Sequence, residues 1–534
     1  MKGLRAEFHL LGWLPPRKGD VLRLSLIWLS AVGLLAAGPA HANWYKASTK
    51  HFIIYADEKP KTLSDFAERL EMFDQAARIL LRMDDPAVGD GNRLTVYVLP
   101  TDNDVRKLVG DKSGFLDGFY TGRVEGSLAY IPKRANGDLG AQSVIYHEYT
   151  HHLMMQQLDQ PYPEWYVEGF AEFLSSPIFG TDGSVGLGTP QEARMWGLVG
   201  SARQMPLDQM LGATYGEIEK LPNDLRESIY ERGWLLVHYL TMEPKRQGQL
   251  SRYILGIANG MPPLASAQAA FGDLKQLDRE LGTYLNRSTM KYFKISGNAI
   301  HPVPVDVQPL SPGAAQIVLL RGQMKFDGKT TNGAQYVAQA RAIEARYPGD
   351  ALVEATLAEA ELDAGNADAA AAAADRALKA DPRSTEPMIL KGRAIELKAK
   401  DEDGDQRKSM FDQARDTFIA ANKLDTEDPE PLFEYYMSYM HEGVRPTANA
   451  IDALHYASDL APQDISVRMN SAISYLEEGK PKDARTTLTL VAYSPHAPQA
   501  AEVAKRMMAD IDGGNSKAAL MELRRSPAPQ SSGD

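Results

Sequence analysis

The chain has 534 residues, enough for two or three domains with separate cores, and it contains no cysteine. The absence of thiols excludes disulfide bonds and thiolate metal sites, so any metal must be held by histidine and carboxylate side chains. The formal net charge is -12, and the sequence has no stripe of Lys and Arg, which argues against nucleic acid as a partner because phosphate binding needs clustered positive charge.

The N-terminus is typical of a signal peptide. Basic residues up to Arg23 precede the apolar run Leu24–Gly38, and Ala40 and Ala42 form a site that signal peptidase accepts. We therefore expect residues 1–42 to be removed and the mature protein to be exported, either to the periplasm or to the medium. An uncleaved anchor is the alternative, although the apolar run is shorter than the roughly 20 residues of a spanning helix. No later segment is apolar enough, so no membrane span is expected after cleavage.

Residues 43–300 have the pattern of an α+β domain. Short apolar runs predict strands at 52–55 and 94–99, and apolar residues at helical spacing predict a helix between them at 63–82. A hairpin is expected over 118–131, just before the segment that carries the chemistry.

That segment contains two histidines and a glutamate in the pattern HExxH. His147 and His151 are four residues apart, so on a helix they project from the same face and can bind one zinc ion. Glu148 lies beside them, where its carboxylate can take a proton from water that the metal has made more acidic. Apolar residues on both sides of the motif predict that this helix has a buried side.

A second segment, which begins at Pro163, supplies two further carboxylates. Glu168 follows the second histidine by 17 residues and is a candidate third ligand. Glu172 lies one helical turn further on, so one of the two glutamates can bind the metal while the other hydrogen-bonds a ligand histidine from the second shell. The small residues Gly169 and Ala171 would let this helix pack closely against the HExxH helix.

The HEYTH segment followed by W-x-x-E-G-x-A-E resembles the gluzincin branch of metallopeptidases, the thermolysin-like clan, and within it the bacterial peptidase-MA-like proteins. The resemblance covers about residues 44–295 and implies a zincin-like fold with one zinc ion per chain. It implies that His147, His151 and Glu168 are the zinc ligands and that Glu148 is the general base.

Two further features follow from the same resemblance. Glu172 takes the position at which the clan has an acidic residue supporting a ligand histidine. The strand near 127–131 would be the sheet edge along which an extended peptide substrate pairs through its backbone.

The donor that stabilises the oxyanion in peptide hydrolysis is harder to assign. Tyr230, in a segment resembling the tyrosine-bearing helix of related proteins, is the candidate, although a packed aromatic is an equally good interpretation. His238 is the alternative, with a buried, hydrogen-bonded histidine as its more common role. Next to the motif, His152 is expected to be a solvent or second-shell residue, and Glu164 belongs to the first turn of its helix.

A proline-rich stretch at 301–312 predicts an extended linker, because proline fixes φ and lacks the backbone donor. After it, residues 313–512 are alanine-rich and helical. The tail at 513–534 ends in Ser, Pro and Gly and is expected to be disordered.

The alanine-rich region contains an internal repeat. Ala370, Ala414, Ala450 and Ala484 align as the small residue of a second helix, with spacings of 44, 36 and 34 residues. A period near 34 is that of the tetratricopeptide repeat, whose small residues let neighbouring helices approach closely. A polar insert at 400–408 accounts for the longest spacing and is expected in a solvent loop, and a degenerate earlier unit is possible before residue 348.

Together these features predict an exported zinc metallopeptidase followed by an all-α tetratricopeptide-repeat solenoid. We expect it to hydrolyse a peptide or protein substrate without a covalent intermediate, while the concave face of the repeats binds a protein partner or the substrate. One alternative is an envelope scaffold whose peptidase-like domain does not catalyse. Another is zinc hydrolysis of a different bond, such as a cell-wall crosslink.

Overall fold

The computed structural model describes most of the chain after the predicted signal peptide, which lies outside the described residues. The described ranges are 44–108, 118–133, 140–157, 162–191, 194–195, 197–198, 204–213, 221–327, 333–493 and 497–525. Within these ranges, no helix combines the length and apolar character needed to cross a bilayer.

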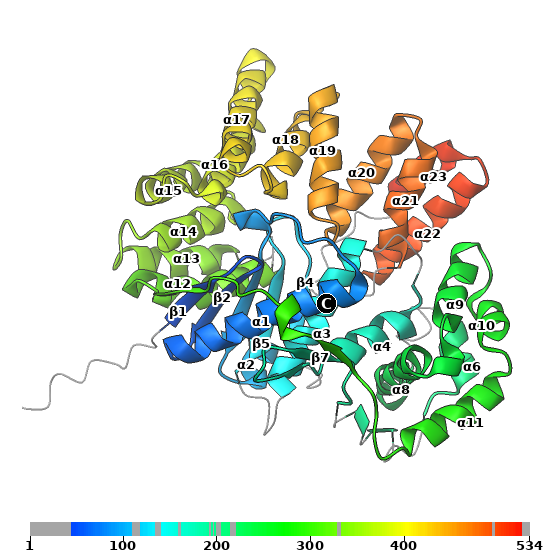
Figure 1. The fold of residues 1–534 in the computed structure, drawn as a ribbon. Coiled ribbons are helices and arrows are strands. Elements are labelled where there is room, and N and C mark those ends of the chain that lie inside the picture. Colours follow the sequence, from blue (N-terminus) through cyan, green and yellow to red (C-terminus); the bar gives the residue numbers. More distant parts are fainter. Residues whose placement is uncertain are drawn as a thin grey trace, which may run out of the picture. The chain divides into compact units, whose positions relative to one another are not determined.

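The N-terminal region is built on a six-stranded mixed sheet with the strand order β4-β5-β3-β2-β1-β9 (Figure 1). Strands β2, β3 and β5 are parallel, and the remaining pairs are antiparallel. The predicted strands at 52–55 and 94–99 and the predicted hairpin are confirmed. The strands are β1 (Trp44–Ser48), β2 (Phe52–Asp57), β3 (Leu94–Leu99), β4 (Phe119–Thr121), β5 (Leu128–Pro132) and β9 (Asp306–Pro309).

The edge of this sheet differs from the expectation. Strand β5, at 128–132, lies between β3 and β4, so it is not an edge. The edge strand is β4, which pairs with β5 through Phe119 opposite Tyr130 and Thr121 opposite Leu128. The prediction failed because the first arm of a hairpin covers one side of the second arm, and the parallel partner β3 covers the other.

The proline-rich stretch at 301–312 is not a free linker. Strand β9 pairs antiparallel with β1, with Ala47 opposite Val307, and forms the other edge of the sheet. Proline is tolerated there because an edge strand needs hydrogen-bond donors on one side only. The sheet of the first domain therefore extends to Pro309.

Alternating side chains on the strands build two cores. On one face, Phe52, Ile54, Val96 and Ile131 join the cluster that contains helices α1 (Pro60–Leu81) and α3 (Gly140–Gln157). Helix α1 matches the predicted helix closely. The buried apolar side of α3 is what fixes the direction in which its histidines point.

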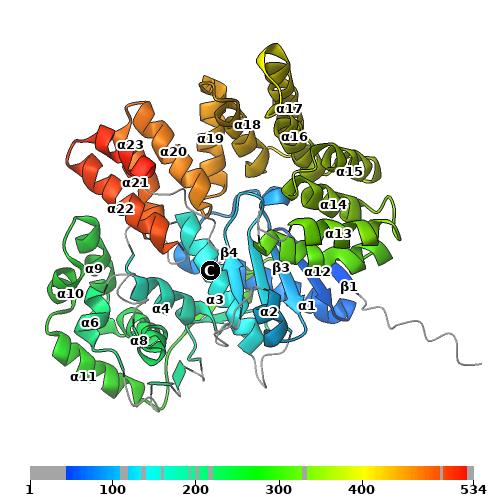
Figure 2. The ribbon, with the colours of Figure 1, turned by 180° about the vertical axis from the view of Figure 1, so that it is seen from behind.

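The opposite face carries a stack of tyrosines. The rings of Tyr55, Tyr97 and Tyr130 lie 5.5 and 5.3 Å apart between centroids. Helices α2 (Asp102–Leu108) and α12 (Pro312–Asp327) contribute to the same cluster (Figure 2). The Tyr130 hydroxyl donates to the carbonyl of Gly322 at 2.7 Å, so α12, which also packs on the next helices of the repeats, completes the core of the first domain.

The rest of the N-terminal region packs around two crossing helices, α4 (Glu164–Leu174) and α8 (Asn223–Met242). They cross at Gly169 and Gly233, where a Cβ on Gly169 would lie 2.6 Å from the Gly233 carbonyl oxygen. Gly169 therefore serves the contact with α8, not the predicted contact with α3. The smaller elements nearby are β6 (Ile178–Phe179), β7 (Val185–Leu187), α6 (Leu207–Gly212), α9 (Gln249–Ala258), α10 (Pro263–Phe271), α11 (Leu274–Leu285) and β8 (Phe293–Ile295).

The C-terminal region is a succession of helix pairs, each packed on the next (Figure 1). Ala370, Ala414, Ala450 and Ala484 are all fully buried, each on the second helix of its pair, which confirms the register inferred from their spacing. Helices α12 and α13 form the earlier unit. The helices after α12 are α13 (Gly333–Glu344), α14 (Ala351–Asp363), α15 (Ala367–Ala380), α16 (Thr385–Ala399), α17 (Gly404–Leu424), α18 (Pro429–Glu442), α19 (Ala448–Leu460), α20 (Ile465–Glu477), α21 (Pro481–Ala492), α22 (Pro498–Asp512) and α23 (Ser516–Arg525).

Two expectations for this region are corrected. The polar insert is a loop only over residues 400–403, because α17 begins at Gly404 and residues 404–408 lengthen this helix. The tail expected to be disordered from 513 contains helix α23, whose Ala519 is buried in the cluster formed with α20, α21 and α22. The polar start of α17 is helical because it continues a packed helix. Helix α23 forms because one of its sides packs against the preceding helices.

Candidate metal centre

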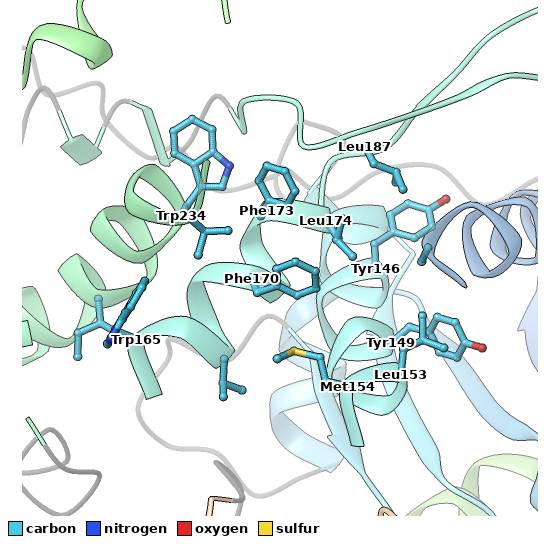
Figure 3. Close-up of a cluster of buried hydrophobic side chains, with 14 of the residues drawn as sticks. Tyr146, Tyr149, Leu153, Met154, Trp165, Phe170, Phe173, Leu174, Leu187 and Trp234 are labelled. Carbon is cyan, nitrogen blue, oxygen red and sulfur yellow. The ribbon is translucent and has the colours of Figure 1, made fainter. Parts of the chain in front are cut away.

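Helix α3 aims two imidazoles at one point. The Nε2 atoms of His147 and His151 lie 3.0 Å apart, as the i and i+4 positions predict. The helix is held in this orientation by its opposite side, where Ile145 is buried in the core together with Tyr149 and Leu153, the two that Figure 3 labels.

Helix α4 adds a carboxylate to the pair. Glu168 Oε2 lies 3.4 Å from Nε2 of His147 and 3.5 Å from Nε2 of His151. The side chains of Glu168 and His151 are almost fully buried, and that of His147 is 14% exposed. Three potential ligand atoms from two helices therefore converge, as predicted from the sequence.

The spacing of these three atoms fits zinc. A tetrahedral ion with ligand bonds of about 2.0–2.2 Å has ligand–ligand edges of about 3.3–3.6 Å. Two of the observed edges, 3.4 and 3.5 Å, fall within this range, and the edge between the two histidine nitrogens, 3.0 Å, is slightly shorter. Two imidazole nitrogens and one carboxylate oxygen are also the donor set of catalytic zinc sites that keep a fourth position open.

The electrostatics of the group favour a cation. Burial alone would lower the pKa of His147, but the adjacent carboxylates of Glu168 and Glu172 outweigh it and raise this pKa to about 10. Burial works to raise the pKa of Glu168, but the neighbouring His151 and His147 hold it well below its ordinary value. Positive charge between these carboxylates is thus stabilised.

Glu172 lies behind His147, on the side of the ring that faces away from Glu168. Its Oε1 atom lies 3.3 Å from Nδ1 of His147. The same oxygen accepts a hydrogen bond from Nη2 of Arg194 at 2.6 Å. Burial opposes ionisation of Glu172, but Arg194 and His147 hold its pKa at about 2, so the carboxylate is charged.

Arg194 was not found from the sequence. It lies outside both motif segments, and an isolated arginine in a polar stretch carries no pattern that would select it. Its guanidinium lies 5.4 Å from the centroid of the Tyr230 ring as well as on Glu172. Arg194 therefore connects Glu172, which lies against His147, with the candidate oxyanion donor Tyr230.

Glu148 and Tyr230 border the same group. The Tyr230 ring centroid lies 6.2 Å from that of His147. The charge of Glu168, followed by burial and the charges of Glu164 and Glu148, raises the pKa of Tyr230 well above its usual value, so the hydroxyl keeps its proton. Burial raises the pKa of Glu148 against the opposing effect of His147 and His151.

The other histidines considered lie elsewhere. His238 is fully buried, hydrogen-bonds with the Lys291 carbonyl at 3.0 Å and the Tyr284 hydroxyl at 2.9 Å, and has a pKa lowered to about 4 by burial. Its role is structural. Of the two roles expected for His152, the solvent role is wrong, because the side chain is buried against Tyr120, whose hydroxyl lies 2.9 Å from its Nδ1. Glu164 opens helix α4, as predicted.

A buried polar network behind α3 was also missed by the sequence analysis. The hydroxyl of Tyr149, inside the HExxH motif, donates to Asp74 Oδ1 on α1 at 2.7 Å. Arg78 donates to the same oxygen at 2.7 Å and to Gln156, near the end of α3, at 3.1 Å. These bonds fasten the back of the motif helix to α1 and fix its rotation about its own axis.

Within the described residues, one further cluster has a metal-like arrangement, formed by His51, Asp74 and Asp85. Here His51 is already engaged, with Nδ1 at 2.8 Å from Glu71 Oε2 and Nε2 at 3.0 Å from Asp85 Oδ1. Burial lowers the pKa of His51, but the bond to Glu71 and the charge of Asp74 raise it overall. The cluster is an ion-paired histidine, not a group of free ligands.

No protein-family model matches the sequence, and no curated protein matches it. Among solved structures, the crystal structure of yeast Tom70 is similar over 74% of this chain and 77% of that chain, with 13% sequence identity and a TM-score of 0.24. A likeness at this level carries no information on activity. The helical repeat region is defined by its own helix pairs and buried alanines.

Proposed function

We propose that this chain is a zinc-dependent metallopeptidase of the gluzincin type. The observation that carries the proposal is the convergence of two imidazole Nε2 atoms, from His147 and His151, and one carboxylate oxygen, from Glu168, at 3.0–3.5 Å from one another. A third protein ligand from a second helix is what distinguishes a catalytic zinc site from a chance HExxH sequence. The signal-peptide pattern at 1–42 supports export.

The residues around this group suit the hydrolysis of a carbonyl compound. When bound, zinc supplies a Lewis acid that polarises the scissile carbonyl and lowers the pKa of water. Glu148, whose pKa is raised by burial, is suited to take a proton from the attacking water and to deliver it to the leaving amine. No side chain needs to form a covalent bond with the substrate.

Tyr230 is suited to stabilise the oxyanion. Its hydroxyl stays protonated because the charge of Glu168 and burial raise its pKa, so it can donate a hydrogen bond to developing negative charge. Arg194 lies against the Tyr230 ring and holds Glu172. It is a positioning residue, since it acts on His147 and Tyr230.

The substrate would bind as an extended peptide along strand β4. This strand is the edge of the sheet next to β5, and an extended chain can pair with the free side of an edge strand through its backbone. The role that the family resemblance implies for 127–131 is therefore transferred to Phe119–Thr121.

The test begins with the zinc content of purified residues 43–534 and of the His147→Ala variant after the same dialysis. We expect one zinc per chain in the parent and none in the variant. The Glu148→Gln variant should keep its zinc and lose nearly all turnover on an unfolded protein substrate, because it retains the ligands and lacks the base. A Glu148→Gln variant with undiminished turnover would contradict the proposal.

A second candidate is an interaction scaffold whose peptidase-like domain does not catalyse. The observation in its favour is the size of the helical repeat region, a type of fold that serves protein binding. Absence of zinc in both the parent and the His147→Ala variant would put this candidate ahead. Zinc in the parent with cleavage of a cell-wall crosslink alone would instead identify a different hydrolase.

A further inference from the structure

The turn between β4 and β5 is in contact with the helical repeats. The backbone N–H of Val124 donates to Asp464 Oδ2, at the start of α20, at 2.7 Å. The Val124 side chain is buried in one cluster with Phe433 and Tyr436 of α18. At the base of the hairpin, the Phe119 ring meets that of Phe326 in α12 at 4.9 Å between centroids.

An ion pair fixes the tip of the same turn. Nη2 of Arg393, in α16, lies 2.9 Å from Glu125 Oε1 and also contacts Glu434 at 2.6 Å and Glu430 at 3.0 Å. Burial opposes the charge of Glu125, but Arg393 and Lys325 hold its pKa at about 2. The turn thus presents a carboxylate to an arginine on the first helix of a repeat, as a bound peptide ligand would.

Glycines make the approach of the two surfaces possible. A Cβ on Gly122 would lie 2.7 Å from the carbonyl oxygen of Gln463, which is backbone and cannot swing away. In the loop before β3, a Cβ on Gly89 would lie 2.6 Å from the backbone of Glu427. Any side chain at these positions would force the surfaces apart.

The other side of the hairpin touches the metal-site helix. A Cβ on Gly118 would overlap the Val144 side chain of α3. The Tyr120 hydroxyl, on β4, lies 2.9 Å from Nδ1 of His152, which directly follows the second ligand histidine. The hairpin therefore bridges the repeats and the helix that carries His147 and His151.

We propose that the first helices of the repeats hold the β4–β5 hairpin as an intramolecular ligand, and that this contact sets the position of the edge strand β4 beside the metal centre. The repeats then form part of the apparatus that binds an extended peptide, an inference that rests on the proposed peptidase function. The inner surface at α16, α18 and α20, expected to receive a separate partner, is engaged by the chain's own hairpin.

The experiment uses two variants of the full mature chain, each with a matched control. Gly122→Ala introduces a methyl group against the Gln463 backbone, and its control is Gly282→Ala, at a helical glycine with nothing within 4 Å. Asp464→Asn replaces the oxygen that accepts from Val124 by an amide that cannot accept, while asparagine still caps α20. Its control is Asp273→Asn, at the N-cap of α11.

Three quantities are measured: amide hydrogen exchange of the segment 118–132, zinc content, and kcat and KM on an unfolded protein substrate. In Gly122→Ala and Asp464→Asn we expect exchange in this segment to rise by about tenfold or more, KM to rise severalfold and zinc content to stay at one per chain. Both controls should match the parent. Even if Gly122→Ala does not fold, Asp464→Asn keeps the test decisive.

The outcomes separate the two proposals. Unchanged exchange over 118–132 in Asp464→Asn overturns the holding of the hairpin, whatever the activity. Raised exchange with an unchanged KM overturns its link to peptide binding. A parent without zinc or turnover refutes the peptidase, while the exchange data still decide whether the repeats hold the hairpin.

Discussion

Replacing Glu172 by alanine tests whether the group around His147 is a supported metal site. The change removes the carboxylate oxygen that lies 3.3 Å from Nδ1 of His147 and accepts from Arg194 at 2.6 Å. It leaves all three ligand atoms in place, so the variant should still bind zinc, but more weakly.

The magnitude follows from what Glu172 does. Loss of a carboxylate that orients a ligand histidine lowers metal affinity by about 10–100-fold, which is about 1.4–2.7 kcal/mol. Glu172 also helps His147 to hold a proton, and its removal lessens that competition. The same negative charge stabilises a divalent ion more than it stabilises a single proton, so the net effect of removing Glu172 is still a loss of zinc affinity.

The assay is a competition titration against a chromophoric zinc chelator at one pH, with parent and variant side by side. The control is Glu227→Ala, which removes an exposed carboxylate on α8 and changes the net charge by the same amount as Glu172→Ala. Its affinity should equal that of the parent. A Glu172→Ala affinity within twofold of the parent, in a chain that is folded by circular dichroism, would refute the reasoning about the site.

Two further predictions concern the oxyanion and the polar network. Tyr230→Phe should lower kcat by about 10²–10³-fold, as loss of an oxyanion donor does, with zinc content unchanged; an unaltered kcat would return Tyr230 to a packing role. His51→Asn should destabilise the chain most below the ordinary His pKa of 6.5, because the raised pKa of His51 gives stability that is present there and is lost as pH rises through the folded value. Urea unfolding of parent and variant at pH 5.5 and pH 9 measures this, and a difference that grows toward pH 9 would contradict the sign.

Local pattern was enough to predict which side chains meet at the candidate site. The i, i+4 spacing of His147 and His151 places them on one face of any helix, and their neighbours Ile145 and Leu153 are apolar enough to bury its other side. Glu168 was found because its own segment has helical patterning at a fixed distance along the chain. These inferences need only the period of the helix and the preference of zinc for such ligands.

The repeats were predicted for a related reason. A small residue that recurs at a near-constant interval marks where neighbouring helices touch, and Ala370, Ala414, Ala450 and Ala484 are indeed fully buried. The interval says nothing about polar segments between units. Helix α17 begins inside the polar insert because a long amphipathic helix needs one apolar side only.

By itself, then, the sequence determined the local elements: the motif helix, the glutamate helix, the main strands and the helix pairs. Only the tertiary structure decided which segments distant along the chain meet. Arg194 reaches Glu172, β9 pairs with β1 and the turn at Val124 reaches α20. Such contacts depend on complementary surfaces, close glycine approaches and the covering of a sheet edge by its neighbour. None of these has a period or a spacing that one stretch of sequence can display.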